Sequence, residues 1–246
     1  MNTGGFRAVV VMVAALAAAG CTPGESATSS SAGQAKHFDV AGFGKLKPGM
    51  SKQDALATGE LGATGAGKSG TCEDYRFQSG PAPDPAELAE DADVEKKYAD
   101  AQKAADEAQA KIGPVPGPNA SAAEFADSAE RNAAAAEASA KVAELASAST
   151  DRIVKRAEAR EAHGGVVFGQ DKLRLIVAPP GATTAKNIGK DSTLEQLKAA
   201  YPDLVSKGED AYELPVPDQK GWVLTFDLKA GKVVALMLFN PEIKCS

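Results

Sequence analysis

Aromatic residues, histidine and cysteine are all scarce in this chain of 246 residues, and each shortage narrows the classes of protein it belongs to. Phe, Trp and Tyr make up 5% of the residues, with a single Trp, so a large aromatic core is excluded. Two histidines and three cysteines leave little material for a metal cluster or a His-dependent triad. A formal net charge of −6 argues against a nucleic-acid-binding surface, which needs an excess of Lys and Arg.

An apolar run near the N-terminus predicts an export signal. Arg7 supplies a positive charge, and residues 8–19 form an apolar stretch that is shorter than the roughly 20 residues of a membrane-spanning helix. The stretch ends in Leu-Ala-Ala-Ala-Gly-Cys, which resembles a lipobox although Ala18 stands where Leu is favoured. The resemblance implies a signal peptide over residues 1–20 and a diacylglyceryl group on Cys21. The alternative is ordinary secretion with a free thiol at this position.

The segment that follows is rich in Ser, Thr, Gly and Ala and lacks periodicity, which predicts a flexible tether over residues 21–38. Two acyl chains suffice for stable anchoring. We therefore expect the folded part of the protein on the extracytoplasmic face of the cell membrane. An oxidising compartment also favours a disulfide between Cys72 and Cys245, and the alternative is two buried thiols.

Two segments, residues 43–59 and 188–202, share a pattern that predicts a short helix in each. A Gly-containing turn precedes a Ser, an acidic residue follows three positions later, and helix formers come next. Such pairs indicate capping boxes at helix starts, and Gly or Pro indicates the helix ends. The capping pairs are Ser51 with Asp54 and Ser192 with Glu195, and the expected ends are Gly59 and Pro202.

Each of these segments is paired with a β-hairpin pattern in which β-branched or aromatic runs flank turn residues. The turns are expected at residues 169–172 and 227–232. Two copies of a helix followed by antiparallel strands predict an α+β fold. The first repeat would comprise residues 39–83 and 163–186, and the second residues 187–246.

The tandem pattern is similar to β-lactamase inhibitory protein, because Gly-Met-Ser at residues 49–51 stands at a helix start with a short sheet behind it. It also resembles the small envelope lipoproteins called SmpA/OmlA and the two-repeat lipoproteins of high-GC Gram-positive bacteria. The resemblance covers residues 40–80 and 163–246. Neither repeat carries its own cysteine pair, and no segment matches the inhibitor's binding loops, so no inhibitory residue is carried over.

A different composition separates the two parts of the first repeat. About a third of residues 84–162 are Ala, and 17 acidic against 10 basic residues give this segment a net charge of −7. A Pro directly after Asp84 predicts a helix that runs to Ile112, and a second helix is expected over residues 122–162. The Pro- and Gly-rich connection at 113–119 makes this an inserted αα-hairpin with an Ala seam. Disorder is the alternative.

Residues 62–69 match the Walker A pattern, G-x-x-x-x-G-K-[ST], which resembles that of P-loop nucleotide-binding proteins. The pattern binds phosphate only between a buried strand and a helix N-terminus. A helix and turn precede it, however, and a short strand-like stretch follows. Residues 223–227 resemble a Walker B strand, but their pattern fits better as one strand of a β-hairpin. Nucleotide binding is therefore a distant alternative.

We expect a non-catalytic, inhibitor-like protein-binding module, with no cofactor and no nucleic-acid partner. The partner would be an envelope or extracellular protein. The sheet would carry helices on one side, and the aromatic residues Trp222, Phe226 and Tyr212 would act as anchors on its free face. The alternative for Trp222 is that it fills the core.

A structural or envelope-assembly role, carried by the helical hairpin, is the second hypothesis. No enzyme is expected. His37 and His163 have no neighbours at ligand spacing for a metal, and no Ser, Cys or carboxylate pair has an assignable catalytic base.

Overall fold

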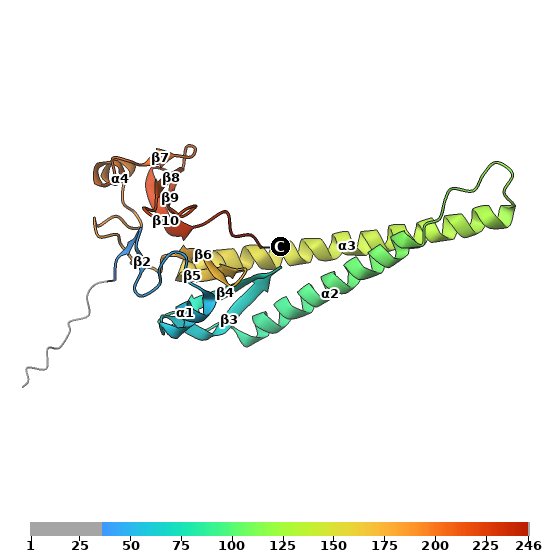
Figure 1. The fold of residues 1–246 in the computed structure, drawn as a ribbon, viewed down its shortest axis with the longest axis horizontal. Coiled ribbons are helices and arrows are strands. Elements are labelled where there is room, and N and C mark those ends of the chain that lie inside the picture. Colours follow the sequence, from blue (N-terminus) through green and yellow to red (C-terminus); the bar gives the residue numbers. More distant parts are fainter. Residues whose placement is uncertain (1–35, 246) are drawn as a thin grey trace, which may run out of the picture. The chain divides into compact units, whose positions relative to one another are not determined.

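A computed structural model describes residues 36–245 of the chain. The expected signal peptide, the lipidation site Cys21 and most of the tether lie outside the described residues. The described residues form an antiparallel sheet with helices packed on it (Figure 1), which confirms the predicted α+β class. The helices are α1 (Lys52–Ala57), α2 (Pro85–Ala110), α3 (Ala122–His163) and α4 (Leu194–Ala200).

The main sheet has eight strands in the order β3-β4-β5-β6-β10-β9-β8-β7, and all neighbours are antiparallel. A separate pair, β1 (Phe38–Asp39) and β2 (Gly42–Phe43), precedes it. The eight strands are β3 (Leu61–Ser69), β4 (Cys72–Phe77), β5 (Gly165–Gly169), β6 (Lys172–Val177), β7 (Val205–Ser206), β8 (Ala211–Pro215), β9 (Val223–Lys229) and β10 (Lys232–Phe239).

The starts of the two short helices follow capping chemistry, with one correction. Ser51 caps α1 by accepting from the Asp54 amide, as expected. The cap of α4 is Thr193, whose box partner is Gln196, so the predicted pair is wrong by one residue. Ser192 instead accepts from the Gly189 amide through its hydroxyl and holds the preceding turn. Ser192 and Thr193 are adjacent, and each has a suitable capping-box partner three positions later. The sequence therefore does not decide which of the two caps the helix.

Two tight turns shorten the loops that the sequence suggested. Gln170 and Asp171 both have positive φ, 53° and 57°, and join β5 to β6. Ala230 and Gly231, with φ of 52° and 73°, join β9 to β10 in the same way. Positive φ at both central residues is the signature of the type I′ turn, whose twist matches that of the strands. The hairpin strands therefore extend into the expected turn residues.

Strand register assigns side chains to two faces of the sheet. The core face carries the large apolar residues that pack with α1, α4 and the N-terminal strand pair, and each is at most 3% exposed. These residues are Phe168, Ile176, Leu224, Phe226, Leu236 and Leu238. The outer face carries the alternate positions, and pairing places Asp74, Val167, Leu175, Phe239 and Val223 in one row across it.

The long helices α2 and α3 lie side by side and separate two strands that are neighbours in the sheet (Figure 1). The chain leaves the sheet after β4 and returns at β5, which pairs with β4. The two ends of the excursion come together, since a Cβ added at Gly80 would lie 3.9 Å from the His163 carbonyl oxygen. Among the described residues, no helix combines the length and apolar character needed to cross a bilayer.

Candidate functional site

The three aromatic residues expected to serve as exposed anchors are buried in the core. Trp222 is 3% exposed, Phe226 is fully buried, and Tyr212 is 8% exposed. The Phe226 ring lies 5.5 Å from that of Tyr201, at the end of α4. These residues therefore cannot contact a partner without unfolding, and the predicted anchor role is corrected. Alternation along β8 and β9 was visible in the sequence, but it does not tell which face of a sheet is covered.

The outer face differs between the two halves of the sheet. Over β4 and β5 it lies beneath α3, so the expectation that helices cover only one side is wrong for this half. Over β9 and β10 it carries Val223, Thr225, Met237 and Phe239, which are all partly exposed. We call these four residues the open face. Val234, at the bulge in β10, is 42% exposed.

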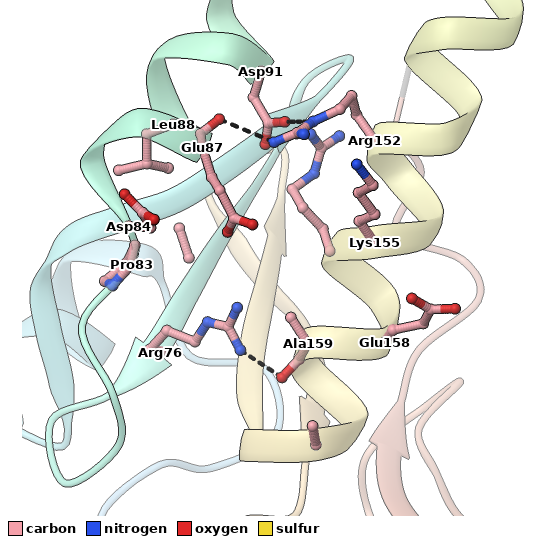
Figure 2. A pocket seen from close by; sticks show the side chains of 13 residues that line it. Arg76, Pro83, Asp84, Glu87, Leu88, Asp91, Arg152, Lys155, Glu158 and Ala159 are labelled. Atoms are coloured by element: carbon pink, nitrogen blue, oxygen red, sulfur yellow. Dashed lines mark hydrogen bonds and ion pairs between the residues drawn. The ribbon is translucent and has the colours of Figure 1, made fainter.

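Where α2 and α3 reach the sheet, they enclose a cavity of about 360 Å³ that we call the root pocket. Figure 2 shows Arg76, Glu87 and Lys155 on three sides of it, from β4, α2 and α3 respectively. Arg76 donates through Nη1 to the Ala159 carbonyl oxygen. Further cavities of about 280 and 460 Å³ adjoin the pocket at Leu88. The lining of the root pocket is completed by Ala66, Pro83, Asp84, Leu88, Asp91, Arg152, Arg156, Glu158, Ala159 and Ala162.

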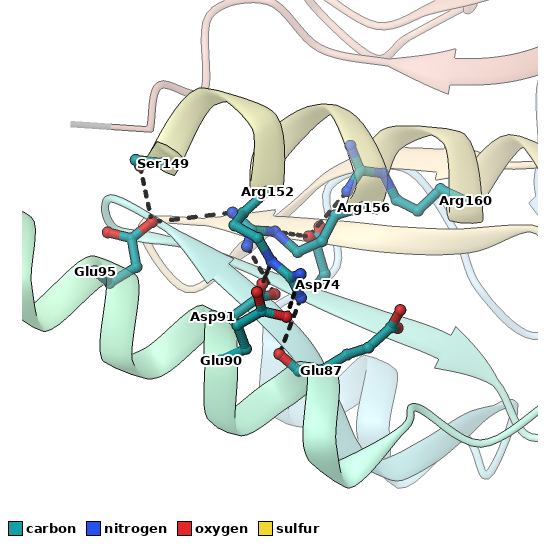
Figure 3. A network of polar contacts seen from close by, with 9 residues as sticks. All are labelled: Asp74, Glu87, Glu90, Asp91, Glu95, Ser149, Arg152, Arg156 and Arg160. Carbon is teal, nitrogen blue, oxygen red and sulfur yellow. Dashed lines mark hydrogen bonds and ion pairs between the residues drawn. The ribbon is translucent and has the colours of Figure 1, made fainter. Parts of the chain in front are cut away.

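A buried ionic cluster fixes the helices above this pocket (Figure 3). We call its members, Asp74, Asp91, Arg152, Arg156 and Arg160, the hairpin root. Asp91 of α2 accepts from the Arg152 Nε and, at 2.8 Å, from Nη1 of Arg156. Asp74 of β4 lies 2.9 Å from Arg160 Nη1 and 3.6 Å from Arg156 Nε. Arg156 therefore joins both helices to the sheet.

Burial dominates the electrostatics of the hairpin root. The side chains of Asp74, Asp91, Arg152 and Arg156 are at most 8% exposed. Desolvation raises the pKa of Asp74 although Arg160 and Arg156 favour its charged form. The Arg156 Nη2 is buried without a hydrogen bond and lies 4.0 Å from a carboxylate oxygen of Glu95. Such a cluster positions the helices specifically, while its desolvation cost offsets much of its attraction.

One glycine of the Walker-like octet, Gly67, has a structural reason. Its φ is 134°, and a Cβ there would lie 2.5 Å from the Arg156 Cδ, so only glycine allows the arginine to pass. The octet itself is the edge strand β3, and β4 follows it with no helix between them. Lys68 lies 3.4 Å from Glu73 rather than in a phosphate loop. The resemblance to a P-loop is therefore one of sequence letters only.

The predicted disulfide between Cys72 and Cys245 is present. It ties the first residue of β4 to the C-terminal segment, which also accepts a hydrogen bond at the Ile243 carbonyl from Arg174 Nε, at 2.6 Å. The bond spans 173 residues of sequence. Closing a loop of this size stabilises the fold by about 5 kcal/mol in the chain-entropy model.

Among residues 36–245, no group of three or more His, Cys, Asp or Glu side chains is arranged to hold a metal ion. His37 precedes β1, and His163 is the last residue of α3. Comparison with protein-family models, with curated proteins and with solved structures found no match.

Sequence reasoning missed the hairpin root, although part of its signal was visible. Arg152, Arg156 and Arg160 recur every four residues and thus lie along one side of a helix. This spacing places the three side chains together, but it is also common on solvated helix faces. Their partners, Asp74 and Asp91, lie on other elements, and no pattern in the sequence around them identifies them.

Proposed function

We propose that this protein is an exported lipoprotein, anchored through Cys21 on the extracytoplasmic face of the cell membrane, that binds another protein without catalysing a reaction. The lipobox-like run, the tether and the disulfide-bonded fold support this assignment of compartment. The tandem resemblance to SmpA/OmlA-type envelope lipoproteins and to β-lactamase inhibitory protein supports a binding role. The partner would be an envelope or extracellular protein.

The open face is the observation that carries the binding role. Val223 and Phe239 are paired across β9 and β10, as are Thr225 and Met237, so the four side chains form one patch. They are mostly apolar and partly exposed, whereas the outer face of β4 and β5 lies beneath α3. Apolar patches of this kind on a rigid sheet are typical of protein interfaces. We infer a partner that presents an apolar strand or loop to β9 and β10.

A matched pair of variants tests this proposal. Crosslinking and pull-down of the lipidated protein from membranes would identify the partner captured by the wild type. Met237→Lys places a charge in the middle of the open face and should abolish that capture. Val205→Lys makes the same kind of change at another apolar residue, 47% exposed on β7, and should retain it. Equal capture by both variants would show that the open face is not the binding surface.

A second candidate function is a structural role of the helical hairpin, and a specific observation favours it. The hairpin root holds α2 and α3 in a fixed orientation on the sheet, while Val115 and Phe125 near their far ends are 88% and 47% exposed. A fixed arm with apolar residues at its tip suits attachment to another envelope component. Val115→Lys combined with Phe125→Lys should then abolish partner capture, and Met237→Lys should leave it intact.

The membrane anchor has its own test. Cys21→Ser removes the sulfur that would carry the diacylglyceryl group. The variant should move from the membrane fraction to the soluble fraction, and metabolic labelling with a fatty acid should be lost. Retention of the variant in the membrane with unchanged labelling contradicts lipidation at this position.

A further inference from the structure

Five charged side chains of the root pocket lie outside the hairpin root, namely Arg76, Asp84, Glu87, Lys155 and Glu158. Asp84 accepts from the Ala86 amide at the start of α2, and Glu158 points away from Arg76 and Glu87 (Figure 2). Arg76 has the Ala159 carbonyl oxygen as its hydrogen-bond partner and forms no ion pair with the described residues. Lys155 and the Glu87 carboxylate likewise take part in no ion pair within residues 36–245. The Glu87 backbone carbonyl accepts from Arg152, which fixes this turn of α2. Besides Asp84 and Glu158, two cations, Arg76 and Lys155, and one carboxylate, Glu87, therefore border the same space (Figure 2).

Asp74 and Glu87 compensate the charge of Arg76 only without direct ion pairs. Burial lowers the pKa of Arg76, and the nearby Arg160 lowers it further, while Asp74 and Glu87 act in the opposite direction. A guanidinium held in this way gains from an anion placed against its free N–H groups. Lys155, on the opposite helix, adds a second positive charge at the same pocket. The Glu87 carboxylate repels a ligand that carries only a negative charge. The best ligand therefore has a hydrogen-bond donor next to its negative group.

The remaining walls limit the size of that ligand. Ala66, Ala159 and Ala162 present only methyl groups, and Pro83 closes one side. At about 360 Å³ the pocket lies at the lower end of the range for small-molecule sites. A ligand with a long side chain does not fit beside these alanines unless it extends into the neighbouring cavities at Leu88.

We propose that the root pocket binds a carboxylate with an adjacent N–H group and a small side chain, the chemistry shared by a free small amino acid and by the C-terminus of a peptide. The carboxylate would lie between Arg76 and Lys155, because a guanidinium binds a carboxylate with two parallel hydrogen bonds. The neighbouring N–H would donate to Glu87. The side chain would rest against the alanine wall. The buried ion pairs of the hairpin root hold α2 and α3 against the sheet beside this pocket.

Isothermal titration of the full chain with three probes tests this assignment. N-acetyl-alanyl-alanine and free alanine carry the carboxylate and the N–H, and the C-terminal amide of the same dipeptide lacks the carboxylate. At least one of the two acids should bind saturably below about 10 mM, and the amide should bind at least about tenfold more weakly. Tighter binding of the dipeptide identifies a peptide terminus as the ligand, and tighter binding of alanine identifies a free amino acid.

Variants then assign the contacts. Lys155→Gln and Arg76→Lys should each weaken binding of the acid about tenfold, since each removes a charged contact or its bidentate geometry. Lys111→Gln, a matched change at the far end of α2, should have no effect. Glu87→Ala should weaken binding of the amino-acid probe and strengthen binding of acetate, which has no donor. Circular dichroism of each variant confirms that α2 and α3 are intact.

Three results would overturn the proposal. The first is the absence of saturable binding of either acid up to about 10 mM. The second is equal affinity for the acid and its amide, which shows that the carboxylate makes no contact. The third is equal weakening by Lys155→Gln and Lys111→Gln, which places the site outside the root pocket. The open face on β9 and β10 has no part in these measurements, so they are independent of the proposed protein-binding function.

Discussion

On the core face of the sheet, Leu224, Phe226 and Leu238 are fully buried among other apolar side chains, whereas on the outer face Asp74 is buried beneath arginines of α3. Both regions exclude water, but they do so with different chemistry. Apolar burial stabilises in proportion to area and needs no particular geometry. Buried charges need exact partners, and their desolvation offsets most of the attraction between them.

The two regions therefore contribute different properties to the fold. The core face makes the sheet stable, and the hairpin root determines where the two long helices lie on it. Removing a core side chain should therefore unfold the protein as a whole. A substitution in the hairpin root should instead destabilise mainly α2 and α3. The open face, on the same side of the sheet as the root, should contribute little to stability.

The largest effect is expected on the core face. Phe226→Ala removes a fully buried ring and leaves a cavity, which should lower the free energy of unfolding by about 3–5 kcal/mol. Its chain neighbour on the outer face, Thr225, provides the control, and Thr225→Ala should cost less than about 1 kcal/mol. Urea unfolding followed by tryptophan fluorescence measures both. Equal losses would show that the two faces do not differ in this way.

Breaking the hairpin root should have the next largest effect. Asp91→Asn removes the charge that Arg152 and Arg156 share and should destabilise α2 and α3 by about 3 kcal/mol. Asp93→Asn, two residues along and half exposed in a surface ion pair with Lys97, should cost less than about 1 kcal/mol. Hydrogen exchange of helix amides, read separately from strand amides, distinguishes local opening from global unfolding. Uniform loss of protection in helices and strands would contradict a positioning role.

Two adjacent acids on β4 should show opposite pH dependence. Burial raises the pKa of Asp74, so its contribution to stability falls as pH rises through that raised pKa and is greatest at lower pH. The hydrogen bond from Lys52, 2.6 Å away, lowers the pKa of Glu73, so its contribution is lost as pH falls through that lowered pKa.

Urea unfolding between about pH 3 and pH 7 tests these signs with Asp74→Asn and Glu73→Gln. Relative to the wild type, Asp74→Asn should become less stable on acidification, because the wild type gains what the variant cannot. Glu73→Gln should become relatively more stable over the same change. Parallel pH profiles for the two variants would rule out this account of β4.

The smallest effect is expected at the open face. Met237 is partly exposed. In Met237→Lys the methylene stem of the lysine still covers the sheet while its ammonium group reaches solvent. The free energy of unfolding should therefore change by less than about 0.5 kcal/mol. A much larger loss in the same urea titration would mean that this patch is part of the core.

The sequence was sufficient for the parts of the fold that depend on local chemistry. Asp84 caps α2 by accepting a hydrogen bond from the Ala86 amide, as a residue before a helix-starting proline should. The runs around residues 170 and 230 form hairpins as predicted. Both features are decided by neighbours within a few residues.

The parts that the sequence did not reveal depend on tertiary packing. β3 was missed because its glycines weaken any strand pattern, and Gly67 is there to let Arg156 pass. The burial of Trp222 and Phe226 depends on which face α4 covers, and alternation is the same for either choice. The hairpin root joins Asp91 to Arg156 across 65 residues, a separation that no local pattern encodes.

The most direct test of the central claim is to remove the helices and ask whether the sheet remains. Replacing residues 80–163 with a short Gly-Ser linker joins β4 to β5, whose pairing is already antiparallel and whose ends already meet. We predict that this variant keeps its strand signal in circular dichroism, its Cys72–Cys245 disulfide and a cooperative unfolding transition. Loss of the strand signal and of cooperativity would show that α2 and α3 belong to the core, and would contradict the account.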